Sequence, residues 1–246
     1  MSRVFNISGV PNLTTEQMVE VDRLMIEDYR IELIQMMENT GRNLAHLARI
    51  RFLDGDPRGR PVVAVAGGGG NGGGALVAIR RLSNWGANVT VVLGQPVQKM
   101  TPVPSHQLDI LRRMGVRIVV DGIPPANPPP AVVLDGLIGY SLRGAPFGRI
   151  AELIRWVNSL DSPILALDAP SGLDATTGVA FDPVIHATAT MTLALPKQGL
   201  RGPDASALVG ELYLADIGVP PGLYARASLG LSLMPIFALD DILRIG

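Results

Sequence analysis

Residues 61–66 read PVVAVA and residues 67–74 read GGGGNGGG, and a stretch typical of a helix follows from about Ala75. The unbroken run of β-branched and small apolar residues predicts a buried strand. A strand that turns through residues without side chains into a helix leaves backbone N–H groups open at the positive end of the helix dipole, where a phosphate can bind. The spacing is neither a clean GxGxxG nor a P-loop. For this segment alone, the alternative is therefore a turn that only lets strand and helix pack closely.

The composition limits the classes of protein to consider. The chain has 246 residues, with 21 Lys or Arg against 22 Asp or Glu, and no block of like charges that would attract a nucleic acid or a membrane surface. It has no cysteine and no basic-then-apolar leader, so we expect a cytoplasmic protein. No apolar run reaches the roughly 18 residues needed to span a bilayer. We expect one domain over residues 1–246.

Strand and helix patterns alternate along most of the chain. Thr14 and Gln17 have the spacing of a capping box, which predicts a helix over 15–28, and a second helix runs from Leu33 towards a stop at Asp54. Strands are predicted at 61–66, 88–93, 116–120, 131–134, 163–167, 188–195 and 208–214, and further helices at 76–85, 105–114 and 147–160. This alternation is typical of a doubly wound, largely parallel α/β sheet with helices on both faces, here with two extra N-terminal helices.

Polar residues at the ends of three strands predict a site. Asn71 belongs to the glycine run, Asp135 follows the strand at 131–134, and Asp168 and Ser171 follow the strand at 163–167. The carboxyl ends of parallel strands share one crevice, so we expect these side chains to converge. Their oxygens form the hard set that binds potassium, magnesium or calcium. Each aspartate taken alone is also compatible with a helix cap or a turn, and Ser171 lacks the GxSxG setting of a nucleophile.

Two further features lie near these strand ends. The loop over residues 138–146 contains Gly139 and Gly144, which lets it close over a ligand, and it carries Arg143 as a candidate phosphate contact. Lys197 is a candidate to neutralise phosphate or to assist proton transfer, and the alternative is a solvated loop lysine. The three histidines are scattered, which favours packing or surface roles over metal binding.

Five motifs occur in order along the chain. They are Met37-Glu38-Asn39-Thr40-Gly41, the loop at 67–76, Leu134-Asp135-Gly136-Leu137-Ile138-Gly139, Gly144-Ala145-Pro146-Phe147 and Leu167-Asp168-Ala169-Pro170-Ser171-Gly172-Leu173-Asp174. Together they resemble the NAD(P)HX epimerase family, the YjeF N-terminal domain. The resemblance covers about residues 14–220, and we expect the tail at 221–246 to cover a sheet edge or a dimer surface.

The resemblance implies a Rossmann-like sheet, a homodimer and a bound potassium ion. It also implies an isomerase that interconverts the R and S forms of hydrated NADH and NADPH, whose nicotinamide C6 carries a hydroxyl. Family potassium ligands correspond to Asn71, Asp135 and Ser171, and Asp168 corresponds to the residue that moves a proton to or from the C6 hydroxyl. Substrate contacts correspond to Gly70, Asn71, Gly72, Gly73 and Gly74, to Gly139, Tyr140, Ser141, Leu142, Arg143, Gly144 and Ala145, and to Asp168.

The glycine run departs from the family pattern, which usually reads Gly-x-Gly-Asn-Asn-Gly-Gly-Asp-Gly. Gly70 replaces the first Asn, Gly74 the Asp and Ala75 the following Gly, so two polar contacts are missing. A second hypothesis is therefore a binding module for a nucleotide, RNA or protein partner, as in the corresponding domain of an mRNA decapping enhancer. The balanced charge disfavours RNA. A Rossmann dehydrogenase is a third, weaker hypothesis, because residues 91–94 lack the acidic group that binds a ribose.

Overall fold

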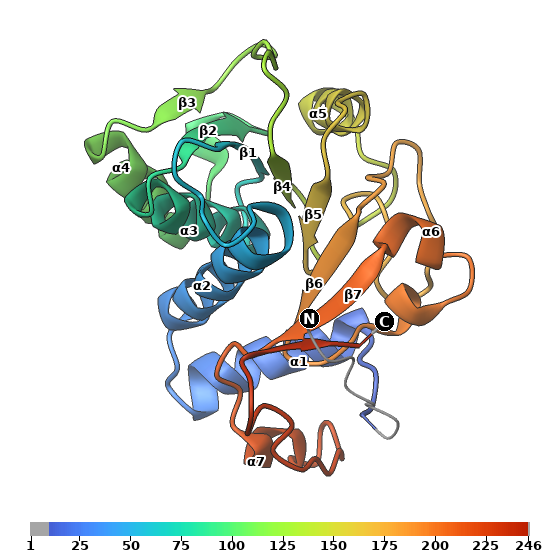
Figure 1. Cartoon of the computed structure of the whole chain (residues 1–246). Helices are drawn as coiled ribbons and strands as arrows, with labels where there is room; N and C mark the ends of the chain where they lie inside the picture. Colours follow the sequence, from blue (N-terminus) through green and yellow to red (C-terminus); the bar gives the residue numbers. More distant parts are fainter. Residues whose placement is uncertain (1–9, 246) are drawn as a thin grey trace.

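The strand β1 (Pro61–Ala66) lies in the middle part of an eight-stranded sheet with the order β3-β2-β1-β4-β5-β6-β7-β8 (Figure 1). The computed structural model describes residues 10–245. Neighbouring strands from β3 to β7 pair in parallel, and β8 pairs antiparallel to β7. After β3 the chain returns to β4 on the other side of β1, which creates a switch point beyond the carboxyl ends of these strands. The predicted α/β fold is confirmed.

The elements follow the predicted alternation. The other strands are β2 (Asn88–Leu93), β3 (Arg117–Val119), β4 (Val132–Gly136), β5 (Ile164–Leu167), β6 (Ala189–Leu193), β7 (Glu211–Ala215) and β8 (Ile242–Arg244). The α-helices are α1 (Thr15–Arg23), α2 (Leu33–Phe52), α3 (Gly70–Asn84), α4 (Pro102–Arg113), α5 (Gly148–Asn158), α6 (Ser206–Val209) and α7 (Pro221–Tyr224). A π-helical turn, η1 (Leu24–Asp28), extends α1, and two 3-10 turns are η2 (Val97–Lys99) and η3 (Gln198–Arg201).

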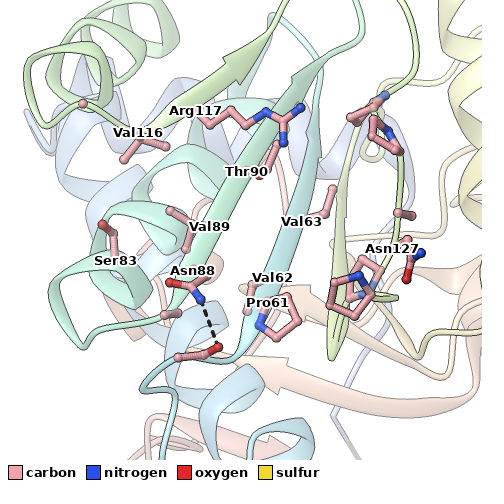
Figure 2. A pocket seen from close by; sticks show the side chains of 18 of the residues that line it. Pro61, Val62, Val63, Ser83, Asn88, Val89, Thr90, Val116, Arg117 and Asn127 are labelled. Atoms are coloured by element: carbon pink, nitrogen blue, oxygen red, sulfur yellow. Dashed lines mark hydrogen bonds between the residues drawn. The ribbon is translucent and has the colours of Figure 1, made fainter.

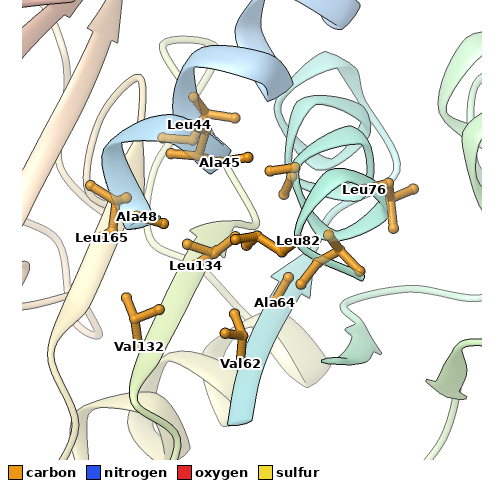
Figure 3. Close-up of a cluster of buried hydrophobic side chains, with 14 of the residues drawn as sticks. Leu44, Ala45, Ala48, Val62, Ala64, Leu76, Leu82, Val132, Leu134 and Leu165 are labelled. Atoms are coloured by element: carbon orange, nitrogen blue, oxygen red, sulfur yellow. The ribbon is translucent and has the colours of Figure 1, made fainter. Parts of the chain in front are cut away.

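Side chains of β1 alternate between two apolar layers, as the period of two in a strand requires. Val62 and Ala64 belong to the core beneath α2 and α3 (Figure 3). Val65 belongs instead to the layer that includes Leu153 and Ile154 of α5. Helices therefore cover both faces of the sheet, which holds the carboxyl end of β1 in a fixed place.

The predicted starts of one helix and one strand are wrong for local reasons. The helix predicted from residue 105 begins at Pro102, because a proline in the first turn needs no partner for a backbone N–H and has a suitable φ. The strand predicted from residue 208 begins at Glu211, because residues before it form the short helix α6. Gly210, with a φ of +62°, ends that helix.

The C-terminal tail covers one edge of the sheet. Leu243 of β8 pairs with Leu214 of β7 and is buried with it. The pairing satisfies backbone groups of β7 that would otherwise be free, and β8 is then the last strand of the sheet. The expectation that the tail covers an edge is confirmed for this segment.

Candidate functional site

The glycine run forms a short turn followed by the start of a helix. Because α3 begins at Gly70, the prediction that the helix starts near residue 75 is wrong. A Cβ on Gly67 would lie 2.1 Å from the carbonyl oxygen of Leu137, and one on Gly72 would lie 1.9 Å from that of Gly67. A Cβ on Gly70 would have no neighbour within 4 Å. Close packing thus explains Gly67 and Gly72, while Gly70 leaves the positive end of α3 open to a ligand.

Asp135 is fully buried inside β4, and not beyond the end of the strand as predicted. Its carboxylate accepts hydrogen bonds from the backbone N–H of Ser171 (2.8 Å), from Ser171 Oγ (2.7 Å) and from the backbone N–H of Leu137 (3.2 Å). Burial raises the pKa of Asp135 to about 6, although these hydrogen bonds act to lower it. Among the described residues, no cationic side chain contributes to this pKa. Asp135 and Ser171 therefore form a tight buried pair without a counter-charge.

Asp168 directly follows β5 in a strained conformation. Its φ of +67° lies in the left-handed region, which few residues other than glycine adopt. Lys197 Nζ lies 2.6 Å from Asp168 Oδ1, and both side chains are almost completely buried. Lys197 Nζ also donates to the carbonyl oxygen of Leu193 (2.7 Å), and the backbone N–H of Tyr140 donates to Asp168 Oδ2 (2.9 Å). Lys197 is thus not the solvated loop lysine, and the strain at Asp168 is of the kind that folds retain at functional sites.

Asn71 lies in the first turn of α3 and is close to the same carboxylate. A Cβ on Gly139 would lie 3.1 Å from both Asn71 Oδ1 and Asp168 Oδ2. Both groups therefore face the same glycine, and a side chain at this position would crowd them. The Asn71 Nδ2 atom is buried and has no hydrogen-bond partner in the described part of the chain. An unpaired buried amide costs about 1–3 kcal/mol, which is expected where a ligand supplies the missing partner.

A second carboxylate, Asp22 of α1, enters the site without having been predicted from the sequence. The Tyr140 hydroxyl donates to Asp22 Oδ2 at 2.5 Å. Burial raises the pKa of Asp22, whereas the Tyr140 hydrogen bond and the charge of Lys197 lower it. Burial, followed by the charge of Asp22, raises the pKa of Tyr140 far above its usual range, so the phenol keeps its proton at neutral pH.

The sequence does contain a signal for Asp22. Met18, Val21 and Met25 form the buried face of the first helix. Asp22 lies four residues after Met18 and therefore on this face, where an amphipathic helix normally carries an apolar residue. A carboxylate in such a position indicates a specific partner.

These groups line one cavity of about 420 Å³ at the carboxyl ends of the strands. Its polar lining includes Asp22, Asn71, Tyr140 and Asp168, and its apolar walls come from α1, η1, α2 and the ends of β6 and β7. Apolar walls with a few converging polar groups are typical of small-molecule sites. Asp22, Tyr140 and Asp168 are the titratable residues among the lining residues in the described chain.

The predicted contact residues divide into three groups. Those that line the cavity are Gly70, Asn71, Gly139, Tyr140, Ser141 and Asp168. Those that line a neighbouring hollow with Ser141 are Leu142, Arg143, Gly144 and Ala145. The remaining three, Gly72, Gly73 and Gly74, are buried, and a Cβ on Gly73 or Gly74 would press on Met37 or Thr40 of α2. Asp135 and Ser171 lie next to the loop that holds Gly139 and do not line the cavity.

A larger hollow of about 570 Å³ lies where β1 and β2 begin (Figure 2). Pro61 and Asn88 line it, and the Asn88 side chain donates to the carbonyl oxygen of Gly59. Among the described residues that line it, Arg117 is the one titratable side chain. Because this hollow has no acid and base together, we place the candidate site at the opposite ends of the strands.

Residues 10–245 contain no cluster of three or more His, Asp or Glu side chains arranged to hold a metal ion. None of their helices is long and apolar enough to cross a membrane.

Comparisons with known proteins agree with the resemblance seen in the motifs. Residues 33–199 match the family model described as YjeF-related protein N-terminus. A protein of Dehalogenimonas lykanthroporepellens named NAD(P)H-hydrate epimerase is 45% identical over 221 residues, which covers 90% of this chain and 87% of that protein. A protein of Cenarchaeum symbiosum with the same name is 39% identical over 188 residues, covering 76% of this chain and 85% of that protein.

Longer relatives and a solved structure are also similar. The bifunctional NAD(P)H-hydrate repair enzyme Nnr of Salinibacter ruber is 34% identical over 232 residues, but this chain spans only 42% of it. The crystal structure of the yeast protein YNL200c superposes with a TM-score of 0.79 at 20% identity, covering 96% of this chain and 100% of the yeast chain. At this identity the yeast structure supports the fold alone.

Proposed function

Because this chain belongs to the family of YjeF-related N-terminal domains, we propose that it interconverts the R and S forms of hydrated NADH and NADPH. Relatives named NAD(P)H-hydrate epimerase align over most of this chain and most of their own length, which supports an isomerase. The single observation that carries the proposal is the buried Asp168–Lys197 pair beside a cavity with apolar walls. A binding module without activity is not favoured, because it would have no need of this strained and buried ion pair.

Epimerisation at C6 requires the bond from C6 to its hydroxyl oxygen to break and to form again on the other face of the ring. The ring nitrogen supplies its electron pair to C6 as the hydroxyl leaves as water, and the ring becomes a cation. Asp168 gives a proton to the departing hydroxyl, and the Lys197 ammonium, 2.6 Å from Asp168 Oδ1, is the source of that proton. The pair recovers a proton from water that returns on its own face of the ring. Lys197 holds the carboxylate in position and limits the energetic penalty of burying its charge.

The charges of the cavity suit a cationic ring. Asp22 and Asp168 bring two carboxylates to the lining, and the Lys197 ammonium lies against Asp168 outside the lining. When both carboxylates are ionised, the site carries one surplus negative charge. A fixed negative charge stabilises positive charge that develops on the ring in the transition state. The open N-terminus of α3 at Gly70 offers backbone N–H groups to the diphosphate of the dinucleotide.

We also propose a potassium ion held by oxygens of Asn71, Asp135 and Ser171. The donor chemistry fits, because amide, carboxylate and hydroxyl oxygens suit a hard cation. The buried Asp135 carboxylate lacks a cationic side chain among the described residues, and a bound cation would supply that charge. When bound, the ion would neutralise Asp135 and hold the segments after β4 and β5 together. Potassium should raise the melting temperature of the wild type more than sodium does, and this difference should vanish in Asp135→Asn.

Three other properties stay predictions. A homodimer is supported by the family resemblance, a cytoplasmic location by the absence of cysteine, and one domain over 1–246 by the shared sheet. Sedimentation equilibrium of the purified protein tests the first of these.

The proposed activity is tested with purified S or R hydrate of NADH and of NADPH. The two epimers are separated by chromatography as they equilibrate, with and without potassium, and a reaction without protein gives the spontaneous rate. We expect the wild type to accelerate equilibration from either side. Equilibration at the spontaneous rate in the presence of wild type would reject the isomerase and favour the binding module.

A further inference from the structure

Tyr140 connects the two carboxylates of the cavity. Its backbone N–H donates to Asp168 Oδ2 at 2.9 Å, and its hydroxyl donates to Asp22 Oδ2 at 2.5 Å. The length of a tyrosine side chain therefore separates the two acids, although both line the same cavity. Asp168 has Lys197 as its cationic partner, whereas Asp22 has a phenol that can give and take a proton.

The position of Asp22 is fixed by contacts at the start of α1. Thr15 Oγ1 donates to the carbonyl oxygen of Tyr140 (3.2 Å), and the backbone N–H of Thr15 donates to Thr176 Oγ1 (2.8 Å). α1 is thereby attached both to the loop that follows β4 and to the segment that follows β5. The π-helical turn η1 begins two residues after Asp22, and such turns are frequent at functional sites.

Inversion at C6 in a ring of fixed orientation needs proton transfer on two faces of the ring. The group that protonates the departing hydroxyl stands on one face, and the water that produces the other epimer must lose a proton on the opposite face. Either the ring turns over within the site or a second group serves that face. In a cavity whose other titratable lining residues are Asp22 and Tyr140, the second group is already present.

We propose that the Tyr140 hydroxyl, hydrogen-bonded to Asp22, is a second catalytic group that transfers protons on the ring face opposite Asp168. This inference rests on the proposed epimerisation. In one direction Asp168 protonates the hydroxyl, the bond from C6 to oxygen breaks with its electrons going to oxygen, and the ring nitrogen supplies a pair to C6. Water then attacks C6 from the other face while the pair returns to nitrogen.

The proton of the attacking water moves to the Tyr140 oxygen as the phenolic proton moves to Asp22, so Tyr140 ends neutral and Asp22 protonated. One proton has thus passed from Asp168 to Asp22. Proton exchange with solvent, or a turnover in the reverse direction, restores the initial protonation states of both residues. The burial that raises the pKa of Asp22 makes it a better proton acceptor than an exposed carboxylate. Because the pKa of Tyr140 is high, its hydroxyl gives a proton to Asp22 only as it takes another proton from the attacking water.

Isotope exchange distinguishes this role from a structural one. The hydrate is prepared with ¹⁸O at the C6 hydroxyl, and both inversion and loss of label to water are followed for each epimer. Asp168 alone can still release water and take it back on its own face, which exchanges oxygen without inversion. In Tyr140→Phe and Asp22→Asn we expect inversion to fall about 100-fold or more, within the range for loss of a general acid or base, while loss of label from one epimer falls less than about 10-fold.

Tyr140→Phe keeps the ring and both backbone hydrogen bonds, so it changes the hydroxyl alone, and its melting temperature is measured to confirm folding. Asp28→Asn is the matched control, because Asp28 is a more exposed carboxylate on η1 whose ion pairs with Arg23 and Arg226 lie outside the cavity. Loss of label and inversion falling by the same factor, or inversion unchanged in Tyr140→Phe, would overturn the inference while the epimerase stands. Wild type at the spontaneous rate would overturn the proposed function and the inference with it.

Discussion

The two ends of the parallel strands both carry a hollow, but they differ in the groups that line it. At the amino ends the larger hollow has Arg117 as its titratable lining residue. At the carboxyl ends the smaller cavity brings together Asp22, Tyr140 and Asp168, with Lys197 buried behind them. We therefore place the candidate site by the convergence of acids, a cation and an unpaired amide, and not by the volume of the hollow.

The difference follows from the topology. Because β1 to β7 run in parallel, the segments that leave β1, β4 and β5 emerge at the same end of the sheet, where the strands have their carboxyl ends. The glycine turn, the Gly139 loop and the turn at Asp168 are such segments, and α1 contacts the Gly139 loop through Tyr140. Segments at the opposite end enter the strands through prolines such as Pro61 and Pro130, which bring no acid or base.

The largest expected effect contrasts the two ends directly. Asp168→Asn should lower the rate of epimerisation by about 10²–10⁴-fold, because the proposed proton donor is lost. Arg117→Ala at the other end should leave this rate unchanged. Both are measured by the approach of one purified epimer to equilibrium at equal protein concentration. A comparable loss of activity in Arg117→Ala would break the assignment of the site to the carboxyl ends.

The buried ion pair predicts a large effect on stability. Lys197→Met should lower the free energy of unfolding by about 3–5 kcal/mol, because Asp168 would remain buried without its partner. Arg113→Met, which breaks an exposed pair with Asp109, should change it by less than about 1 kcal/mol. Urea unfolding followed by circular dichroism measures both. Equal losses in the two variants would show that burial does not set the strength of the Lys197 contact.

Asp135 predicts a dependence of stability on pH. Its pKa is about 6 in the folded state and about 3.9 in an unfolded chain. The folded protein therefore binds the proton more tightly, and this contribution to stability is complete below about pH 4 and is lost as the pH rises through about 6. In buffer without potassium, wild type should lose about 3 kcal/mol relative to Asp135→Asn between about pH 4 and 7. Parallel curves for the two proteins would be inconsistent with an uncompensated buried carboxylate.

Substitutions in the glycine run should have the smallest effects. They distinguish a glycine required for close packing from one that leaves the start of α3 open to a ligand. Gly72→Ala should destabilise the protein by about 1–3 kcal/mol, because its Cβ would meet the carbonyl oxygen of Gly67. Gly70→Ala should keep or slightly raise stability, because there is open space and alanine favours a helix. Thermal unfolding of the pair measures the contrast. A larger loss in Gly70→Ala than in Gly72→Ala would contradict the packing at the start of α3.

Features set by short-range patterns could be predicted from the sequence. The bounds of β1 and β2 agree with the prediction, because each is rich in β-branched residues and lies between turn signals. The capping box of Thr14 and Gln17 forms as expected. Asn71, Asp135, Asp168 and Ser171 lie near the carboxyl ends of the strands, as parallel topology requires. Their approach could therefore be predicted without any knowledge of distances.

Features set by long-range contacts could not be predicted. Lys197 is separated by 29 residues from the carboxylate that it contacts, and nothing local distinguishes it from an exposed lysine. Asp22 meets Tyr140 across 118 residues. The edge strand β8 is not predicted from the sequence. Its three residues form a strand because they pair with β7, and their own short pattern gives no signal of this. Tertiary packing decides these cases, so a single sequence carries only indirect signals of them.

We propose that hydrate epimerisation takes place in the cavity beyond the carboxyl ends of the strands. A crystal structure of Asp168→Asn, soaked with the hydrate that this variant converts slowly, is a direct test of this claim. We predict density for the hydrated ring between Asn71, Tyr140 and the substituted residue 168, with the diphosphate at the start of α3. Density for the ring in the hollow beside Arg117 would contradict the claim.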